Sequence, residues 1–477
     1  MEKLKEYCGV LGIVCDDFNF NIAGQMYSGL MALQHRGQIF SGISTSTCDT
    51  KIFTYKKRGI VSKVLRPNIL KKFPGNSGIG HVSCGPKYVF TQEEAQPFHL
   101  DSEIVNFSIS MNGTINNTKT IHQKLSNLGK IFVGKSDIEL VATLIETIYH
   151  MNNDMLKTIK QTIDIIKGAY SIIILSDNGH LYGFKDDHGY RPLCYGSVER
   201  NHKKFYVIAS ESCALDALGI NLCGEISSGE ILHINPVQGL EKIKYKTMES
   251  QKFCIFEYIY FARPDSIIND ISVFDVRYLL GVNLAREDKQ IFNHKNAIVV
   301  PVPDSGRSAA MGYAWESHLP YQEGLIKNRY IWQLKSDPEQ KLNTIKSVLK
   351  DKDVILVDDS ILSGKTMKKI IRMLKNANAK SIHVRISSPP VRFNCKTNER
   401  YLERDILIAD PEISGTEEYP LFVKKVLSYI GADSLKYQTI KGLLNSIGEM
   451  SNNVCLKCIY HKSLKKKKDL PKLNSFL

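Results

Sequence analysis

Two adjacent carboxylates, Asp358 and Asp359, stand where a short apolar run ends. The run 354–357 is rich in β-branched residues, which is typical of a buried strand in a parallel sheet. Because ligands of open α/β sheets sit outside the carboxyl ends of the strands, the two acids are well placed to face a ligand. Small polar residues and Gly364 follow, and residues 367–374 carry apolar side chains at helical spacing. A turn entering a helix offers backbone N–H groups to phosphate. The stretch 354–366 therefore predicts a sugar-phosphate site, with acids for the hydroxyls and Mg²⁺.

Two other interpretations of this stretch are weaker. The sequence Ser-Gly-Lys-Thr at 363–366 resembles the end of a Walker A motif, but that motif needs glycine at position 359, where the chain has Asp359. The remaining alternative is a surface loop with two solvated acids, and the order strand, acids, turn, helix disfavours it.

A second candidate is Cys8, which begins the apolar run 8–14, a predicted strand. By itself a cysteine at the start of a strand is more often a buried apolar residue than a nucleophile. The types and spacing of its neighbours along the chain decide between the two interpretations.

The elements that must position these residues differ between the two halves of the chain. In the first half the apolar spacing predicts helices at 23–33, 138–151 and 154–167, a hairpin formed by 170–175 and 180–184, and a strand at 205–209. Asn112-Gly113 follows the strand-like run 106–111 and is expected to form a turn. In the second half short apolar strands are expected at 297–302, 354–357 and 382–386, with a helix at 367–374 between the last two. An α+β domain is thus predicted up to about residue 250 and a parallel α/β domain after it.

Composition limits the function classes. The 477 residues are 43% hydrophobic and 23% charged, which is ordinary for a globular protein of two or three domains. No run is long enough to cross a membrane, and the eleven irregularly placed cysteines favour a reducing compartment, so a cytoplasmic location is expected. The net charge of +14 favours phosphorylated substrates. The basic tail 461–477 is interpreted as a solvated terminus, so neither nucleic acid nor a membrane is an expected partner.

Several motifs occur in a recognisable order. They are Cys8-Gly-Val-Leu-Gly-Ile, Leu33-Gln-His-Arg-Gly-Gln, Gly80-His-Val, Asn112-Gly113, Ser136-Asp-Ile-Glu, Cys254-Ile-Phe-Glu-Tyr-Ile-Tyr-Phe-Ala-Arg-Pro-Asp-Ser, Val302-Pro-Asp-Ser-Gly, Gly324-Leu-Ile-Lys-Asn-Arg-Tyr and the acidic stretch. From Cys8 to about Cys458 the chain resembles the amidophosphoribosyltransferases. The resemblance implies an N-terminal-nucleophile glutamine amidotransferase domain of αββα type (8–250), followed by a type I phosphoribosyltransferase domain (251–460). It also implies the first step of purine synthesis, with glutamine and phosphoribosylpyrophosphate as substrates, and a homo-oligomer.

The resemblance implies roles in the first domain. Cys8 attacks the glutamine amide with its own α-amine as base, which requires removal of residues 1–7 as a propeptide. Asn112 and the Gly113 N–H form the oxyanion hole. Asp137 holds the substrate ammonium, and Arg36 belongs to the glutamine pocket.

In the second domain the implied site binds phosphoribosylpyrophosphate and Mg²⁺. Asp358 and Asp359 hold the ribose hydroxyls and the metal, and Ser305 lies near the metal-pyrophosphate end. The remaining implied contacts come from Lys327, Tyr330, Ser360, Gly364 and Thr366.

Four cysteines carry a further implication. Some members of the family hold a [4Fe–4S] cluster and begin with a short propeptide, and this chain matches their cysteine positions with Cys254, Cys395, Cys455 and Cys458. Zinc also accepts four sulfurs and stays an alternative.

The chain departs from the family pattern at several positions. Ser83 stands where the family has an arginine that pairs with the α-carboxylate of glutamine, and Met111 replaces a histidine. Trp332-Gln-Leu-Lys replaces Gly-Arg-Thr-Phe, while Ser363 and Lys365 stand where the family has arginine and threonine. Two alternatives follow: an ammonia-dependent enzyme, or a catalytically reduced homologue that binds phosphoribosylpyrophosphate as a regulatory protein. Glucosamine-6-phosphate synthase shares only the first domain type, and the acidic stretch argues against it.

Overall fold

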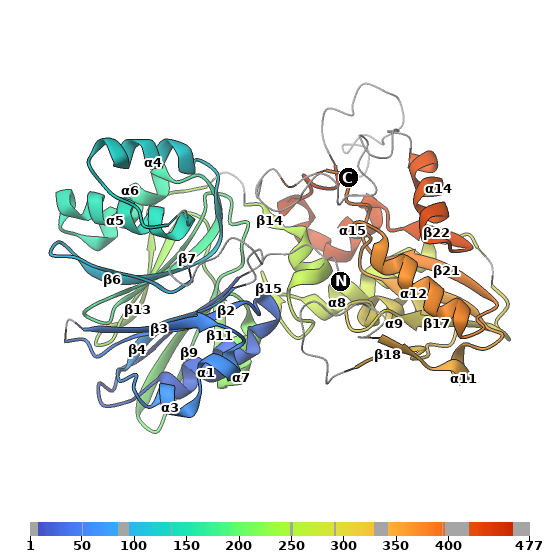
Figure 1. Ribbon diagram of the computed structural model, residues 1–477, viewed down its shortest axis with the longest axis horizontal. Coiled ribbons are helices and arrows are strands. Elements are labelled where there is room, and N and C mark those ends of the chain that lie inside the picture. Colours follow the sequence, from blue (N-terminus) through green and yellow to red (C-terminus); the bar gives the residue numbers. More distant parts are fainter. Residues whose placement is uncertain are drawn as a thin grey trace. The chain divides into compact units, whose positions relative to one another are not determined.

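The computed structural model describes residues 8–49, 51–83, 95–134, 136–248, 251–290, 292–328, 342–393, 395 and 419–460 (Figure 1). They form two compact units. The N-terminal unit comprises the described residues of 8–277 and 447–455, and the C-terminal unit those of 278–446 and 456–460. The division falls inside helix α8 (Val273–Arg286). The boundaries drawn from the sequence at 7/8, 250/251 and 460/461 stay predictions.

The N-terminal unit contains two antiparallel sheets. The first has the strand order β11-β9-β10-β1-β4-β2-β3. Its strands are β1 (Gly9–Cys15), β2 (Phe40–Ser46), β3 (Ile52–Arg58), β4 (Ser77–Ser83), β9 (Cys194–Arg200), β10 (Lys203–Ala209) and β11 (Asn221–Glu225). The second has the order β13-β12-β8-β7-β6-β5. Its strands are β5 (Phe98–Asp101), β6 (Asn106–Ile115), β7 (Gly168–Ser176), β8 (Leu181–Lys185), β12 (Glu230–Asn235) and β13 (Gly239–Lys244).

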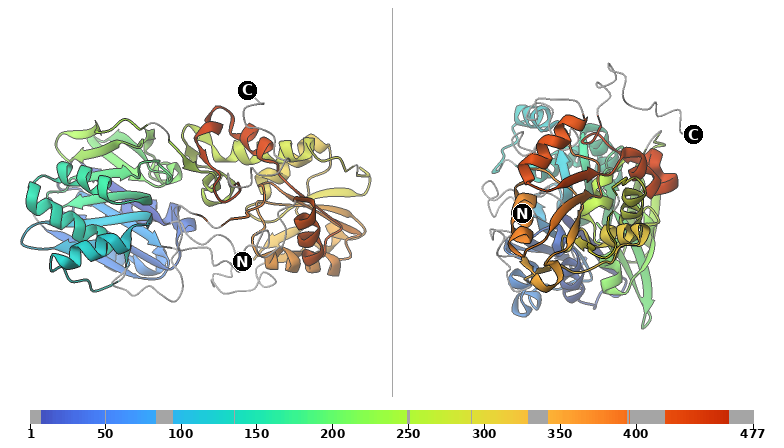
Figure 2. Two further views of the ribbon diagram at one scale, coloured as in Figure 1. Left: turned by 90° about the horizontal axis from the view of Figure 1, so that it is seen from above. Right: turned by 90° about the vertical axis from the view of Figure 1, so that its right-hand side faces the viewer.

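Helices cover the outer face of each sheet, which makes the unit an αββα sandwich (Figures 1 and 2). The helices are α1 (Ala23–Ala32), α2 (Val61–Val64), α3 (Pro67–Leu70), α4 (Thr118–Asn127), α5 (Asp137–Asn152), α6 (Met155–Ile165) and α7 (Ser212–Leu218), with the short 3₁₀ turn η1 (Gln34–Arg36) after α1. Buried residues of both sheets, among them Val10, Ile173 and Leu232, pack together between them. The predicted helices, the hairpin and the strand at 205–209 are confirmed within one or two residues at most ends.

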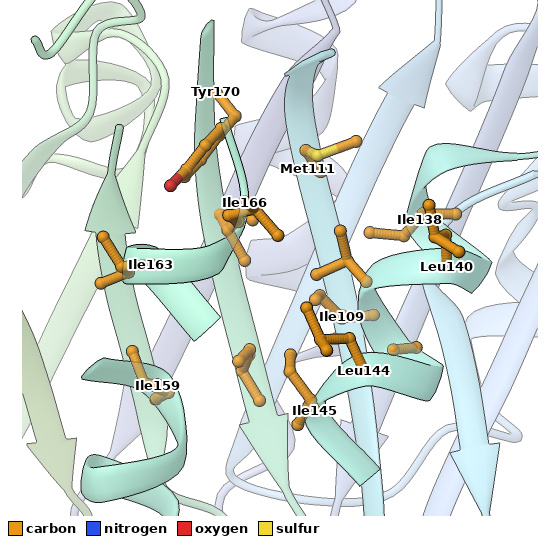
Figure 3. Packing of buried hydrophobic residues seen from close by; sticks show 14 of the residues in the cluster. Ile109, Met111, Ile138, Leu140, Leu144, Ile145, Ile159, Ile163, Ile166 and Tyr170 are labelled. Carbon is orange, nitrogen blue, oxygen red and sulfur yellow. The ribbon is translucent and has the colours of Figure 1, made fainter. Parts of the chain in front are cut away.

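Figure 3 shows how α5 and α6 pack on the second sheet. Leu144 and Ile145 of α5 lie near Ile109 of β6, Ile138 belongs to the same buried cluster, and each of the four is at most 6% exposed. Each such side chain contributes roughly 1.5–3 kcal/mol of stabilisation when fully buried. The packing holds the start of α5, which carries Asp137, beside the end of β6, which carries Asn112 and Gly113.

The C-terminal unit is built on a four-stranded, fully parallel sheet in the order β17-β20-β21-β22. Its strands are β17 (Ala297–Pro301), β20 (Asp353–Asp358), β21 (Ser381–Ile386) and β22 (Ser434–Tyr437). Helices α12 (Lys365–Asn376) and α14 (Tyr419–Ile430) pack on one face, and α8 and α9 (Arg307–Ser317) on the other. Burial on both faces is the reason that β17 and β20 read as continuous apolar runs, whereas β21 carries His383 and Arg385 between its apolar residues.

Shorter elements complete the two units. In the C-terminal unit they are β18 (Leu325–Lys327), β19 (Leu342–Thr344), α11 (Lys346–Leu349) and α15 (Ile440–Ile447). In the N-terminal unit they are β14 (Phe253–Cys254), the π-helical turn η2 (Glu257–Phe261), β15 (Ile267–Ile268), β16 (Ile271–Ser272), η4 (Gly448–Asn453) and β23 (Val454–Cys455). Among the described residues, no helix has both the length and the apolar character needed to span a bilayer.

Candidate active site

Cys8 directly precedes β1, a central strand of the first sheet, and is partly buried. The carbonyl oxygen of Cys8 accepts a hydrogen bond from Nε of Arg36, with a nitrogen–oxygen distance of 3.1 Å. Gly9 pairs with Val82 of β4, and from Leu11 onward the strand is also paired on its other side by β10. The candidate nucleophile is therefore held by strand pairing from Gly9 onward and by Arg36 at its own carbonyl. The predicted propeptide, residues 1–7, lies outside the described residues.

Arg36 is buried, and its guanidinium contacts two carboxylates. It donates to Glu211 at 2.5 Å, and to the two oxygens of Glu257 at 3.1 and 3.0 Å. Burial opposes the charge of Arg36, but the two neighbouring glutamates raise its pKa above the ordinary value. Burial likewise opposes the charge of Glu211, but His35 and Arg36 hold its pKa well below the usual range. Arg36 and Glu211 are thus both charged at neutral pH. The predicted place of Arg36 in the glutamine pocket stays a prediction.

Asn112 and Gly113 lie within strand β6, so the expected turn at this position is wrong. Strand β6 continues to Ile115 because β7 pairs with it beyond the Asn-Gly pair, with Gly113 opposite Tyr170. Asn112 is 1% exposed, and among the described residues no acceptor lies within hydrogen-bond distance of its Nδ2. A buried amide N–H without a partner costs free energy, which is consistent with a donor kept for a ligand.

Gly113 needs to be glycine on two counts. Its φ is +129°, and an added Cβ would lie 1.9 Å from the carbonyl oxygen of Ala169. We expect Gly113→Ala to lower the free energy of unfolding by roughly 2–4 kcal/mol through clash and backbone strain. Gly129→Ala is the matched control, because Gly129 has a φ of +79° with nothing within 4 Å of an added Cβ. Urea unfolding of both variants tests this, and equal losses would contradict the clash.

Asp137 is the first residue of α5 and is 8% exposed. Ser136 caps this helix, because its side-chain oxygen accepts from Glu139 N. Oδ2 of Asp137 accepts from the Ile115 N–H at 2.9 Å, two residues beyond Gly113. The fold therefore brings Asp137 beside the end of the strand that carries Asn112 and Gly113.

His81 links the strand of Cys8 to the strand of Asn112. On β4 it is the register partner of Val10, two residues after Cys8. Its Nε2 lies 3.2 Å from the carbonyl oxygen of Met111, the residue before Asn112. Since a carbonyl only accepts, the neutral ring carries its proton on Nε2. The predicted glutaminase residues Cys8, Asn112, Gly113 and Asp137 thus belong to one connected region.

Burial gives His81 an acid-sensitive role. It is 1% exposed, and burial lowers its pKa to about 3. The folded-state pKa of His81 lies below its unfolded value of about 6.5. The contribution of His81 to the free energy of unfolding is therefore fully present above about pH 6.5 and is lost as the pH falls toward 3. This group should cost about 2 kcal/mol of unfolding free energy between pH 7.5 and pH 5.

Replacement by glutamine tests the acid effect. His81→Gln keeps an N–H donor for the Met111 carbonyl but does not titrate, so the variant should lose about 2 kcal/mol less than the parent chain between the two pH values. Urea unfolding at pH 7.5 and 5 measures the difference. The exposed His202 supplies the control His202→Gln, which should lose as much as the parent chain. A parallel loss in His81→Gln and the parent would contradict the assignment.

Ser83 ends β4 and is 4% exposed. The backbone of Gly37 packs directly on it, because a Cβ added to Gly37 would lie 2.4 Å from Ser83 N. Residues 84–94, which follow the position where the family pattern has arginine, lie outside the described residues.

The acid pair of the C-terminal unit stands at the carboxyl end of β20. Asp358 and Asp359 are 3% and 1% exposed. Ser305 Oγ donates to Asp358 Oδ1 at 3.2 Å, so the Val302-Pro-Asp-Ser-Gly loop reaches the acids, and the predicted role of Ser305 near the pyrophosphate stays a prediction. Ser360 Oγ donates to Asp359 Oδ1 at 2.5 Å. Carboxylate and hydroxyl oxygens at one sheet edge can coordinate Mg²⁺ and can accept hydrogen bonds from ribose hydroxyls.

The turn after the acids leads into α12. Gly364 precedes the helix with a φ of +74°, a conformation that glycine adopts without strain. Ser363 Oγ accepts from the N–H of Lys365, the first residue of the helix, at 3.3 Å, and the carbonyl of Gly364 accepts from Lys368 N at 2.9 Å. Thr366 lies in the first turn of the helix. The N-terminus of α12 thus follows the acids within one loop, which is the order expected for binding a phosphate.

Lys327 on β18 reaches the same loop as Ser305. Its Nζ lies 2.8 Å from Oδ2 of Asp304, and Arg307 pairs with the other oxygen of Asp304 at 3.0 Å. Tyr330, the other predicted residue of this segment, lies outside the described residues.

Sequence reasoning missed three acids. Glu257 lies in the motif that begins at Cys254, but no role was assigned to it. Asp304 directly precedes Ser305, to which a role was assigned, and Glu211 lies in no motif. For the first two the motif itself was the available signal. Glu211 is recognisable only from its contact with Arg36, which is 175 residues away in sequence.

The four candidate cluster cysteines show two local relationships. Cys254 on β14 and Cys455 on β23 are register partners in a parallel pair. In the C-terminal unit the Cys458 carbonyl accepts from the Arg392 and Phe393 N–H groups at 3.0 Å, shortly before Cys395 in sequence. Within the described part of the chain, no three His, Cys, Asp or Glu side chains form a group arranged to hold a metal ion.

Comparisons with known proteins support the two-unit description. A family model described as a glutamine amidotransferase domain matches residues 86–217, and one described as a phosphoribosyl transferase domain matches residues 280–389. Amidophosphoribosyltransferase from Pyrococcus horikoshii is 38% identical over 443 residues, covering 91% of this chain and 92% of the relative. The Bacillus subtilis enzyme of the same name is 35% identical, covering 96% and 94%.

Solved structures agree with these relatives. The B. subtilis glutamine phosphoribosylpyrophosphate amidotransferase complexed with ADP and GMP superposes with a TM-score of 0.82 at 33% identity, covering 95% of this chain and 96% of the other. A structure titled as the allosteric regulatory enzyme of purine biosynthesis gives a TM-score of 0.84 at 34% identity, covering 95% of each chain. The predicted fold class, an amidotransferase domain followed by a phosphoribosyltransferase domain with a parallel sheet, is confirmed. The chain belongs to the amidophosphoribosyltransferase family.

Proposed function

We propose that this chain transfers the amide nitrogen of glutamine to C1 of phosphoribosylpyrophosphate. One water is consumed, and 5-phosphoribosylamine, glutamate and pyrophosphate are formed in the first step of purine synthesis. The observation that carries the proposal is the acid pair Asp358–Asp359 at the end of β20, in contact with Ser305 and directly before the N-terminus of α12. Membership in the family supports it further.

In the glutaminase half, Cys8 Sγ attacks the side-chain carbonyl carbon of glutamine, and the freed α-amine of Cys8 takes the thiol proton. The buried Nδ2 of Asn112 and the N–H of Gly113 stabilise the oxyanion. Ammonia leaves, and water hydrolyses the resulting thioester to glutamate. Asp137 receives the ammonium group of the substrate, and Arg36 belongs to the same pocket.

In the transfer half, ammonia displaces pyrophosphate from C1 of the ribose. Asp358 and Asp359 bind the ribose hydroxyls, and Ser305 faces the pyrophosphate end. The amides and hydroxyls of 360–366, including those of Ser360, Gly364 and Thr366, bind the 5-phosphate. Lys327 and Tyr330 complete the contacts.

Mg²⁺ fits the acid pair because hard oxygen ligands suit it. Asp358, Asp359 and Ser305 would hold the ion, and a bound Mg²⁺ neutralises charge on the pyrophosphate leaving group.

We also propose a [4Fe–4S] cluster on Cys254, Cys395, Cys455 and Cys458. Four thiolates are the usual ligand set, and the register of Cys254 with Cys455 supports a shared site for that pair. Iron and acid-labile sulfide are measured on anaerobically purified protein. We expect about four iron atoms and about four sulfide ions per chain. Zinc without sulfide would instead indicate a zinc site with four sulfur ligands.

One observation favours a second candidate function. Ser83 cannot make the bidentate contact to the glutamine α-carboxylate that arginine makes, and losing such a pair costs on the order of 2–5 kcal/mol. An enzyme that depends on free ammonia, or a catalytically reduced protein that binds phosphoribosylpyrophosphate, is therefore the alternative.

The test compares nitrogen sources. Pyrophosphate release is measured with glutamine and with ammonium on anaerobically purified protein, together with the intact mass of the N-terminus. Release with both sources and a chain that begins at Cys8 is the expected result. Release with ammonium alone would overturn the glutaminase half. An uncleaved N-terminus together with no pyrophosphate release from either nitrogen source would contradict the assignment of the chain as an enzyme.

A further inference from the structure

Arg36, which donates to the carbonyl of Cys8, contacts glutamates from two other segments of the N-terminal unit. Arg36 ends the turn after α1, Glu211 follows β10, and Glu257 begins the π-helical turn η2. Their side chains are at most 1% exposed and form what we call the Arg36 cluster. Nε of Arg36 donates to the Cys8 carbonyl, while its terminal nitrogens contact the two glutamates.

The two glutamates differ in what else they hold. Glu211 also accepts from Arg263 N at 2.9 Å and from Ser266 Oγ at 2.7 Å, and it contacts His35 at 2.7 Å. Each carboxylate oxygen of Glu257 accepts from Arg36, in the bidentate arrangement that fixes the plane of a guanidinium. Glu257 thus determines the direction of Nε, whereas Glu211 also anchors neighbouring backbone.

The direction of Nε matters because of where Cys8 lies. Once residues 1–7 are removed, Cys8 is the chain terminus, and terminal residues lose order unless something holds them. Strand pairing begins at Gly9. The hydrogen bond to the Cys8 carbonyl restricts the rotation between Cys8 and Gly9, and with it the directions of the α-amine and Sγ.

We propose that Glu257 is a positioning residue for the glutaminase half-reaction. It orients Arg36, which holds the Cys8 carbonyl and keeps the amine and thiol of Cys8 aligned for attack on glutamine. This proposal rests on the proposed function. It assigns a role to an acid that touches neither glutamine nor the reacting atoms.

Glu257→Gln is the probe, because it keeps the shape of the side chain but loses its charge and the second acceptor oxygen. The matched control is Glu225→Gln. Glu225 pairs with Lys185 at 3.1 Å in the same unit, and its side chain is 14% exposed. Glutamine hydrolysis in the presence of phosphoribosylpyrophosphate, ammonium-dependent pyrophosphate release and melting temperature are measured for the parent and both variants.

The expected result is a split between kinetic constants. In Glu257→Gln, kcat for glutamine hydrolysis falls about 10- to 100-fold and KM for glutamine changes less than about 3-fold, because the misplaced group is the nucleophile. Ammonium-dependent release is unchanged. Glu225→Gln also removes the charge of a paired glutamate but leaves kcat unchanged.

Arg36→Lys is the second variant, and it carries the test if Glu257→Gln shows no cooperative melting. Lysine keeps the positive charge but lacks the planar guanidinium whose Nε–H holds the Cys8 carbonyl while its terminal nitrogens contact Glu257. The same fall in kcat is therefore expected. Parent-level kcat in a folded Glu257→Gln or Arg36→Lys protein would overturn the positioning role and leave the proposed function standing. A parent chain that releases pyrophosphate only with ammonium would overturn the glutaminase half of the proposed function, and the positioning role with it.

Discussion

Replacing Cys8 by alanine should lower glutamine-dependent pyrophosphate release by about 1,000-fold or more, while ammonium-dependent release stays at the parent level. The thiol forms the covalent intermediate, and no neighbouring group can replace a nucleophile that is removed. Free ammonia enters after that step and does not need it. Steady-state assays with each nitrogen source measure the two activities separately.

A second cysteine of the same unit provides the control. Cys223 on β11 is exposed, and Cys223→Ala should leave both activities unchanged. Glutamine-dependent turnover that survives in Cys8→Ala would contradict the assignment of Cys8 and require a different nucleophile. Loss of ammonium-dependent release as well would show that the change disturbs the fold beyond the N-terminal unit.

The second large effect is expected at the acid pair. Asp359→Asn should lower pyrophosphate release about 30- to 5,000-fold with either nitrogen source, which corresponds to losing roughly 2–5 kcal/mol of charged contacts to the substrate and its metal. The two nitrogen routes converge on the same displacement at C1, so both activities fall together. Asparagine has nearly the same shape, and its side-chain oxygen can still accept from Ser360 Oγ.

The control lies on the same strand. Asp353 begins β20 at the opposite end from Asp359 and accepts from Ser381 Oγ at 2.6 Å. Asp353→Asn should change release less than about 2-fold, since its expected effect is only that of a partly exposed polar contact. Parent-level release in Asp359→Asn would mean that phosphoribosylpyrophosphate binds elsewhere. Selective loss of the glutamine-dependent activity alone would contradict the division of roles between the two units.

The parallel sheet of the C-terminal unit follows directly from local sequence. The runs 297–302 and 354–357 are apolar without alternation, because helices cover both faces of the strands they form, whereas the run 382–386 alternates apolar residues with His383 and Arg385. The position of Asp358 and Asp359 was predictable for the same reason, since the apolar run ends at the edge of the core. Strand ends in a parallel sheet share one edge, and there the structure brings Ser305, from the loop after β17, to Asp358.

Asn112-Gly113 shows where local signals mislead. The pair is a strong turn signal, yet β7 continues the ladder past it and Gly113 adopts its positive φ inside the strand. Pairing with a segment more than fifty residues further along the chain outweighs the local preference, and no window of the sequence contains that partner.

The acid pair is thus the feature that the sequence by itself determined most completely, because hydrophobic periodicity places a strand end and the chemistry of its neighbours names a ligand class. The surroundings of Cys8 are the opposite case. Its position at the start of a strand was predictable, but Arg36 finds its partners 175 and 221 residues away. Burial and ion pairing join segments that are distant in sequence. Only the tertiary structure therefore decided that Glu211 and Glu257 contact Arg36, which holds the carbonyl of Cys8.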